Sequence, residues 1–142
     1  MKSLLSCVAI FVSLTLSIAH ADTALETSMK KMADAAHQLA ADLKQTDDTK
    51  HAKDIDLQSV ATIKDASTKA HDEVPKKAKA LPADQQQTMT ASYQKDMETF
   101  AKDVDALGQD IQTDNWPAAR TDFAKVMDDE KNGHKAYRVK KN

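Results

Sequence analysis

Regularly spaced apolar residues constrain this chain more than any other feature of its sequence. From residue 25 onward they recur at alternating intervals of four and three, which places them on one face of a helix. The chain has only two glycines and three prolines, so long helices are favoured and strands have little material. The pattern therefore predicts an all-α domain. The two most regular seams are Leu25, Met29, Met32, Ala36, Leu39 and Leu43, and then Met89, Tyr93, Met97, Phe100, Val104, Leu107 and Ile111.

Turn-forming residues divide the chain into four predicted helices. Thr46-Asp47-Asp48-Thr49 favours turns and caps, so the first loop is expected there. A second, less regular helix should end near Val74, because Pro75 disfavours its continuation. Asp84 is the expected cap of the third helix, and Asp114-Asn115-Trp116-Pro117 joins capping residues to a first-turn proline at the start of the fourth. The second helix has this predicted seam: Ile55, Val60, Ile63, Ala66, Ala70 and Val74.

Short connections between the helices predict how they are arranged. The longest, residues 76–83, is still short enough for neighbouring helices to pack antiparallel. We therefore predict an antiparallel up-down-up-down four-helix bundle with a left-handed twist. In that topology the first and fourth helices are neighbours. Met29, near the start of the first helix, is then expected beside His134, near the end of the fourth.

The predicted fourth helix changes character along its inward face. Phe123 and Val126 are typical of a core, whereas Glu130 and His134 put ionisable groups on the same face. Polar groups at core positions need a partner, solvent or a ligand, because burying them unpaired is unfavourable. The end of the bundle that holds His134 is therefore the candidate functional site. The same face also carries Ala119, Met127 and Tyr137.

Residues 1–21 have the pattern of a cleaved signal peptide. Lys2 supplies the positive start, residues 4–18 are mostly apolar, and Ala19-His20-Ala21 has small residues at both recognition positions. The apolar run is shorter than the roughly 20 residues that a membrane-spanning helix needs, so no membrane span is expected. Cleavage after Ala21 would release residues 22–142 into the periplasm. We expect these residues to form one domain and a monomer.

Composition argues against several classes of function. The only cysteine, Cys7, lies in the predicted signal peptide, so the mature chain can form neither a disulfide nor a thioether bond to a haem. The formal net charge is −2, and loss of Lys2 makes it more negative by one. The one basic cluster, residues 135–141, is a short chain end. Nucleic acid is not an expected partner, because neutralising phosphates requires clustered lysine and arginine.

Both ends of the mature chain resemble those of the soluble cytochromes b562. Leu25-Glu26-Thr27-Ser28-Met29 is similar to that family's Leu-Glu-x-x-Met, whose methionine is an axial haem ligand. His134-Lys135-Ala136-Tyr137-Arg138 is similar to its closing His-x-x-Tyr-Arg, whose histidine is the other ligand. Residues 63–75 follow its second helix and terminal proline, although the loops here are longer and Gly133 replaces a usually larger residue. Three residues fall where the family has bulky residues lining its haem pocket: Tyr93, Met97 and Phe100.

This resemblance implies one non-covalently bound b-type haem per chain, with Met29 and His134 as the axial ligands of its iron. Two axial ligands leave no position for a substrate, so it implies electron transfer to unknown redox partner proteins and no enzyme activity. A thioether with an imidazole raises the reduction potential relative to two harder ligands. One alternative stays open: a haem-free periplasmic helical bundle that binds a partner or acts under stress.

Each candidate residue also has a simpler interpretation. A methionine on a seam usually fills space in a core, and a histidine near a chain end is usually solvated. Met32 competes with Met29 as a ligand and is assigned to the core. Tyr137 and Arg138 are expected to pack or pair near the end of the bundle, with an arginine contact to a haem propionate left open. A di-iron site is not predicted, because the sequence contains no Glu-x-x-His motif. Three other histidines are predicted to be surface residues without the spacing of a metal site: His37, His51 and His71.

Overall fold

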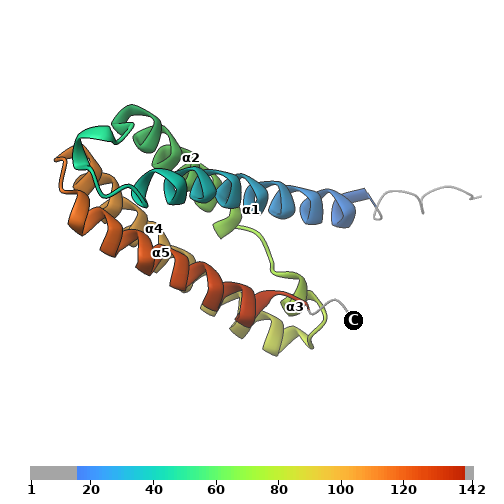
Figure 1. The fold of residues 1–142 in the computed structure, drawn as a ribbon. Coiled ribbons are helices and arrows are strands. Elements are labelled where there is room, and N and C mark those ends of the chain that lie inside the picture. Colours follow the sequence, from blue (N-terminus) through green and yellow to red (C-terminus); the bar gives the residue numbers. More distant parts are fainter. Residues whose placement is uncertain (1–15, 140–142) are drawn as a thin grey trace, which may run out of the picture.

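The structure is a computed structural model that describes residues 16–139, with side chains from residue 24 onward. Within that range the chain forms four long α-helices and two short helical turns, and it contains no strand (Figure 1). The all-α prediction is confirmed. The elements are α1 (Leu16–Leu43), the 3-10 turn η1 (Asp48–Lys50), α2 (Lys53–His71), α3 (Lys76–Lys79), α4 (Ala83–Gln112) and α5 (Trp116–Tyr137).

The predicted signal peptide, residues 1–21, lies mostly outside the described residues. Its predicted cleavage position, after Ala21, falls within α1. The signal peptide and its removal therefore stay predictions. Among the helices that the structure describes, none is long and apolar enough to cross a membrane.

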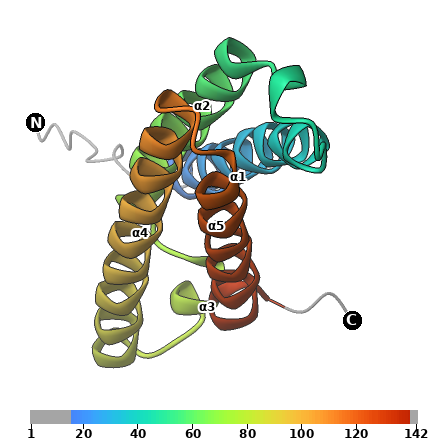
Figure 2. The same cartoon turned by 60° about the vertical axis from the view of Figure 1, so that its left-hand side comes forward.

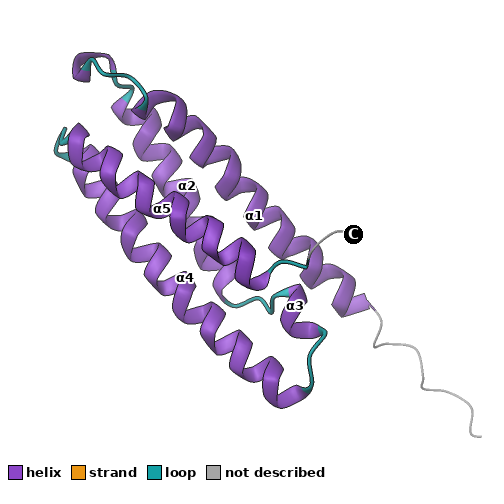
Figure 3. Ribbon diagram, turned by 60° about the horizontal axis from the view of Figure 1, so that its bottom comes forward, coloured by secondary structure: helices purple, strands orange, loops and turns teal. Residues whose placement is uncertain are grey.

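The long helices pack largely in the order of the chain. α1 lies against α2, α2 against α4, and α4 against α5 (Figure 3). α1 and α5 approach one another where α1 ends and α5 begins, and from there they diverge (Figures 1 and 2). Each large apolar side chain that is fully buried contributes about 1.5–3 kcal/mol to stability. The innermost core residues come from all four helices: Leu39, Ile63, Val104, Leu107, Ile111, Ala119 and Val126.

A glycine lets α2 and α4 pack closely. A Cβ atom added to Gly108 would lie 3.1 Å from Cγ1 of Val60, which is tighter than ordinary van der Waals contact. Gly108 interrupts the apolar seam of α4 in the sequence. The close approach of the two helices explains why a larger residue would not fit there.

Turns form at two of the predicted positions, the first with a side-chain cap and the second without one. Asp47 accepts hydrogen bonds from the backbone N–H of Thr49 (3.1 Å) and from its hydroxyl (2.6 Å), which shapes the first loop. Asp114 has a φ of 58°, a left-handed conformation that aspartate tolerates better than most residues. This conformation turns the chain into α5, and Pro117 stands in its first turn. The predicted start of the fourth helix is thus confirmed.

Other predicted boundaries were wrong. α2 ends at His71 rather than near Val74, because the backbone N–H groups that follow bond back to the Ala70 carbonyl and close the helix. A helical turn, α3, forms inside the predicted connection. Asp84 is not the cap of α4: Pro82 precedes the helix, and Asp84 lies in its first turn, where a carboxylate favours the positive end of the helix dipole.

The buried face of α2 differs from the predicted one at its start. Ile55 was expected in the core but is 46% exposed, and Asp56 is fully buried instead. Asp56 precedes Val60 by four residues and Ile63 by seven, a spacing that keeps all three on one helix face. The buried face of α2 therefore begins with the carboxylate of Asp56.

Candidate functional site

The two candidate methionines of α1 lie in different environments. Met29 is half-buried and packs against the edge of the core. Met32, one turn further along, is only 8% exposed and belongs to the core itself. The assignment of Met32 to the core is therefore confirmed, and the Met29 thioether lies closer to the molecular surface.

His134 lies in the last turn of α5 and is exposed. Its carbonyl accepts a hydrogen bond from the backbone N–H of Arg138 (3.1 Å), which closes the helix. A Cβ atom added to the neighbouring Gly133 would meet nothing within 4 Å, so there is open space on this side of α5. The predicted inward face thus loses burial toward its end. Ala119 and Val126 are buried, and four later or flanking residues are half-buried: Phe123, Met127, Glu130 and Tyr137.

The short helix α3 contacts α1 near residue 26 and α5 near its end. Lys76 forms an ion pair with Glu26 of α1. Lys77 donates a hydrogen bond from Nζ to the carbonyl of Ala136 in α5 (2.8 Å). Because α3 is a single short turn, these two contacts bring residue 26 of α1 and the end of α5 to the same part of the molecule.

Met29 and His134 flank these contacts, one on each of the two helices. Met29 follows Glu26 by three residues, and His134 precedes Ala136 by two. Figures 1 and 2 show that α1 and α5 are separated at this end, and that α3 lies beside α5 on the side of α4. α1 and α5 diverge toward this end, so the structure does not confirm the prediction that Met29 lies beside His134. We call this end the open end.

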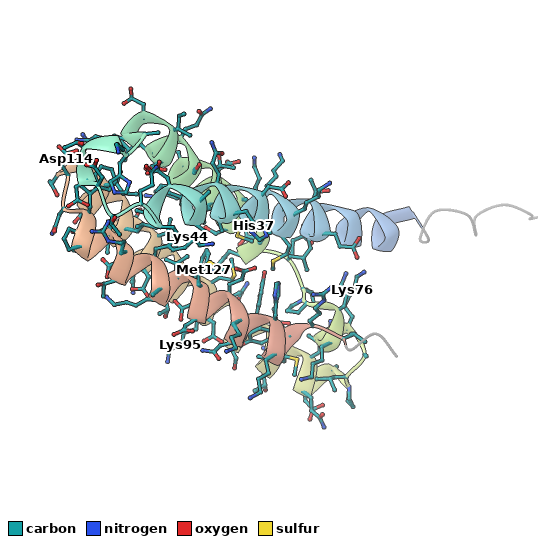
Figure 4. The ribbon with its side chains drawn as sticks, in the orientation of Figure 1. His37, Lys44, Lys76, Lys95, Asp114 and Met127 are labelled. Atoms are coloured by element: carbon teal, nitrogen blue, oxygen red, sulfur yellow. The ribbon has the colours of Figure 1, made fainter. Side chains whose placement is uncertain are left out.

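Half-buried apolar side chains from three helices border the core on this side. Met29 comes from α1, Met97 from α4, and Phe123 and Met127 from α5, and each packs against the core without being fully covered. Met127 lies between the α1 and α5 ribbons in Figure 4. Single exposed apolar residues are normal on protein surfaces. Several from separate helices can together cover the apolar surface of a ligand.

Two tyrosines order the structure near the end of α5. The rings of Tyr93 and Tyr137 meet edge to face, with centroids 5.2 Å apart. Tyr137 donates a hydrogen bond to Oδ2 of Asp96 (2.6 Å), and Tyr93 donates one to the carbonyl of Ala70 (2.8 Å). Burial raises the pKa of both hydroxyls, and nearby carboxylates, Glu73 for Tyr93 and Asp96 for Tyr137, raise it further. Both tyrosines are therefore neutral donors. The prediction that Tyr137 packs and pairs at this end is confirmed.

A second group of polar side chains, at the opposite end, was not predicted from the sequence. The prediction that His51 is a surface residue was wrong, because its side chain is 0% exposed. Its ring stacks on Trp116 with centroids 4.0 Å apart, and its Nδ1 lies 2.6 Å from Oδ2 of Asp42. Burial comes from Trp116, which is distant in sequence, so no local pattern around His51 indicates it. We call this the closed end.

Asp42 and the buried Asp56 face one another across the closed end. Burial acts to raise the pKa of Asp42, but hydrogen bonds from His51, Asp56 and the backbone of Ala52 outweigh it and lower that pKa. For Asp56, burial and then the neighbouring Asp42 carboxylate raise the pKa to about 7. The spacing of Asp56 from the α2 seam could have indicated its burial.

Comparison with known proteins found no family model, curated protein or solved structure that matches this chain.

Proposed function

We propose that this protein is a periplasmic electron-transfer protein that binds one b-type haem non-covalently at the open end. Met29 and His134 are the axial ligands. The observation that carries the proposal is their position near two contacts of α3, one to Glu26 of α1 and one to Ala136 of α5. The motifs around them are those that resemble the soluble cytochromes b562.

The proposal includes an antiparallel up-down-up-down course of the four long helices and a monomeric chain. Helices that follow one another in the sequence pack side by side, and their connections are short, which supports this course. The weak contact between α1 and α5 leaves one side of such a bundle available for a flat ligand.

The residues of the open end fit a haem in donor type and in polarity. The Met29 thioether and the His134 imidazole both bind iron, and the thioether favours the reduced state. Met97, Phe123 and Met127 would cover apolar ligand surface and exclude water. Met32 anchors α1 in the core one turn from Met29, and the bond from Tyr137 to Asp96 steadies the end of α5 near His134. When bound, the haem supplies a one-electron redox centre.

Two protein ligands on the iron leave no position for a substrate, so the proposed role is electron transfer without enzyme activity. The redox partner proteins meet the chain at its surface. Export to the periplasm follows from the predicted signal peptide, residues 1–21. The absence of cysteine from residues 22–142 makes the haem removable rather than covalently attached.

Haem titration of the full chain tests the proposal. We expect saturation at one haem per chain, a sharp low-spin b-type spectrum after reduction, and complete release of the haem into acidified organic solvent. His134→Ala should weaken haem binding at least a hundredfold, because imidazole is the stronger of the two ligands. His37→Ala removes an exposed histidine of α1 and should change nothing. If the wild type shows no saturable binding, or if His134→Ala binds haem with an unchanged spectrum, the proposal is wrong.

A further inference from the structure

The closed end brings together three side chains that carry metal-binding atoms. Asp42 comes from the last turn of α1, His51 follows η1, and Asp56 lies in the first turns of α2. One potential ligand atom from each residue lies within 4.8 Å of the other two. Imidazole nitrogen and carboxylate oxygen are donors that zinc-type cations use in proteins. The set is also protected from solvent: the His51 side chain and Asp56 are 0% exposed, and the Asp42 side chain is 13% exposed.

Asp56 is the residue that points to a ligand. Both of its carboxylate oxygens are buried, and neither accepts a hydrogen bond from a donor group among the described residues. The neighbouring Asp42 carboxylate can pair with it only by sharing a proton. Buried carboxylates in proteins are ordinarily paired, hydrogen-bonded or bound to metal, because isolating one is very unfavourable. Its neighbour Asp42 is no donor when ionised. That carboxylate already accepts bonds from Gln45 Nε2 (3.0 Å), from the His51 ring and from the Ala52 backbone N–H (3.3 Å).

We propose that Asp42, His51 and Asp56 bind one divalent transition-metal ion of the zinc type. His51 binds as neutral imidazole through Nδ1, and its ring proton moves to Nε2. Any proton held between the two carboxylates is released to solvent, as is usual when a metal replaces protons at its ligands. Two ionised carboxylates balance the charge of the ion. Three protein ligands leave one coordination position for water.

The surroundings of His51 suit this binding mode. Oδ1 of Asp48 lies 3.6 Å from Nε2, just beyond hydrogen-bond range, and a small movement would let it accept the relocated proton and orient the ring. Nη1 of Arg120 lies 3.5 Å from Nε2 and donates toward it, so metal binding requires this guanidinium to turn fully to the Asp48 carboxylate, to which it already bonds (3.2 Å). Stacking on Trp116 fixes the plane of the ring. The ion would tie the connection after α1 to both α1 and α2. This proposal does not depend on haem binding, which concerns the opposite end.

Zinc binding by the full chain tests the site, with the metal first removed by EDTA and the chelator then dialysed away. Elemental analysis after dialysis against micromolar Zn²⁺ gives the stoichiometry, and thermal unfolding with and without Zn²⁺ gives the stability. Asp56→Asn keeps the shape of the side chain and supplies an amide that can donate to Asp42. Asp54→Asn is the matched control, because Asp54 lies two residues away in the same helix and is exposed.

The wild type and Asp54→Asn should each bind one Zn²⁺ and melt several degrees higher in its presence. Asp56→Asn should bind Zn²⁺ at least tenfold more weakly and gain no stability from it. Without metal, Asp56→Asn should be at least as stable as the wild type, because it lacks the unpartnered carboxylate. Should that variant fail to fold, Asp42→Asn replaces it. Equal zinc affinity in the wild type and the variant, or no zinc bound by the wild type, would show that the three residues share only a proton.

Discussion

The two ends of this molecule are held together in different ways. At the closed end, Arg120 of α5 reaches the Gln45 carbonyl (3.3 Å) and the Asp48 carboxylate (3.2 Å) beyond α1. Lys53 of α2 forms an ion pair with Asp114 (3.0 Å), and Trp116 is buried against His51. At the open end, α1 and α5 are connected through the lysines of α3. Both lysines are exposed, and exposed ion pairs of long side chains contribute little to stability.

The difference follows from the distribution of apolar residues along the helix seams. Toward the closed end the seams finish on large buried side chains, Leu43, Ile111 and Trp116. Toward the open end the inward positions of α5 pass to Glu130, Gly133 and an exposed His134. Apolar burial drives helices together, so a seam that loses its apolar residues has less to hold its neighbour. We therefore expect the closed end to contribute more to the stability of the fold than the open end.

Large-to-small substitutions at the two ends should have unequal costs in the absence of haem. Trp116→Ala removes a side chain that is 4% exposed and should lower the free energy of unfolding by about 3–5 kcal/mol. Met97→Ala removes a half-buried side chain at the open end and should cost roughly 1 kcal/mol, well below the range for fully buried methionine. Urea unfolding followed by circular dichroism measures both. Similar losses of unfolding free energy in the two variants would show that the closed end does not contribute more to stability than the open end.

A smaller effect is expected from Asp129 of α5, which faces α4. Its Oδ2 is buried and has no hydrogen-bond partner among the described residues. Burial raises its pKa above the ordinary 3.8, and Asp103, Asp96 and Asp128 raise it further. A carboxyl group whose pKa is raised by folding stabilises the fold only while it is protonated. That contribution is complete below the unfolded pKa and is lost as the pH rises through the folded pKa.

Asp129→Asn should therefore stabilise the protein at pH 7, by roughly 1 kcal/mol or less because the group is partly exposed to solvent. The gain should shrink as the pH falls through the raised pKa of folded Asp129 and should be lost below the unfolded pKa of 3.8. Unfolding curves recorded at pH 7 and pH 3 provide the measurement, with the exposed neighbour changed in Asp128→Asn as the control. A loss of stability at pH 7 would mean that the Asp129 carboxylate is paired in solution.

Most of the helical content and much of the core could be predicted from the sequence. The seams of α1 and α4 alternate regularly, and their buried residues, Leu39, Val104 and Leu107 among them, are those that the spacing indicates. The turn before α5 contains Asp114, Asn115 and Pro117, residue types that favour turns and helix starts, so its position was also predictable. In such segments local propensity and tertiary packing agree.

Other features depend on packing between distant segments and have weak local signals. Ile55 is the more apolar choice for the core, yet the phase of α2 set by Val60 and Ile63 buries Asp56 instead. His51 is buried by Trp116 from the start of α5. The candidate haem ligands were indicated by family resemblance, and the α3 contacts near them come from a helix that the sequence did not indicate. Haem binding itself stays a prediction.

We propose that the open end binds haem through Met29 and His134. Comparison of Met29→Ala with Met32→Ala tests this proposal most directly. With haem bound, Met29→Ala should shift the oxidised iron toward high spin or a water ligand and should lower the reduction potential, because the thioether favours ferrous iron. Met32→Ala should keep the wild-type spectrum while losing about 2–5 kcal/mol of stability, since Met32 is a core residue. Oxidised spectra and potentials of both variants distinguish ligand from core. An unchanged spectrum in Met29→Ala, or a ligand-loss spectrum in Met32→Ala, would contradict the assignment.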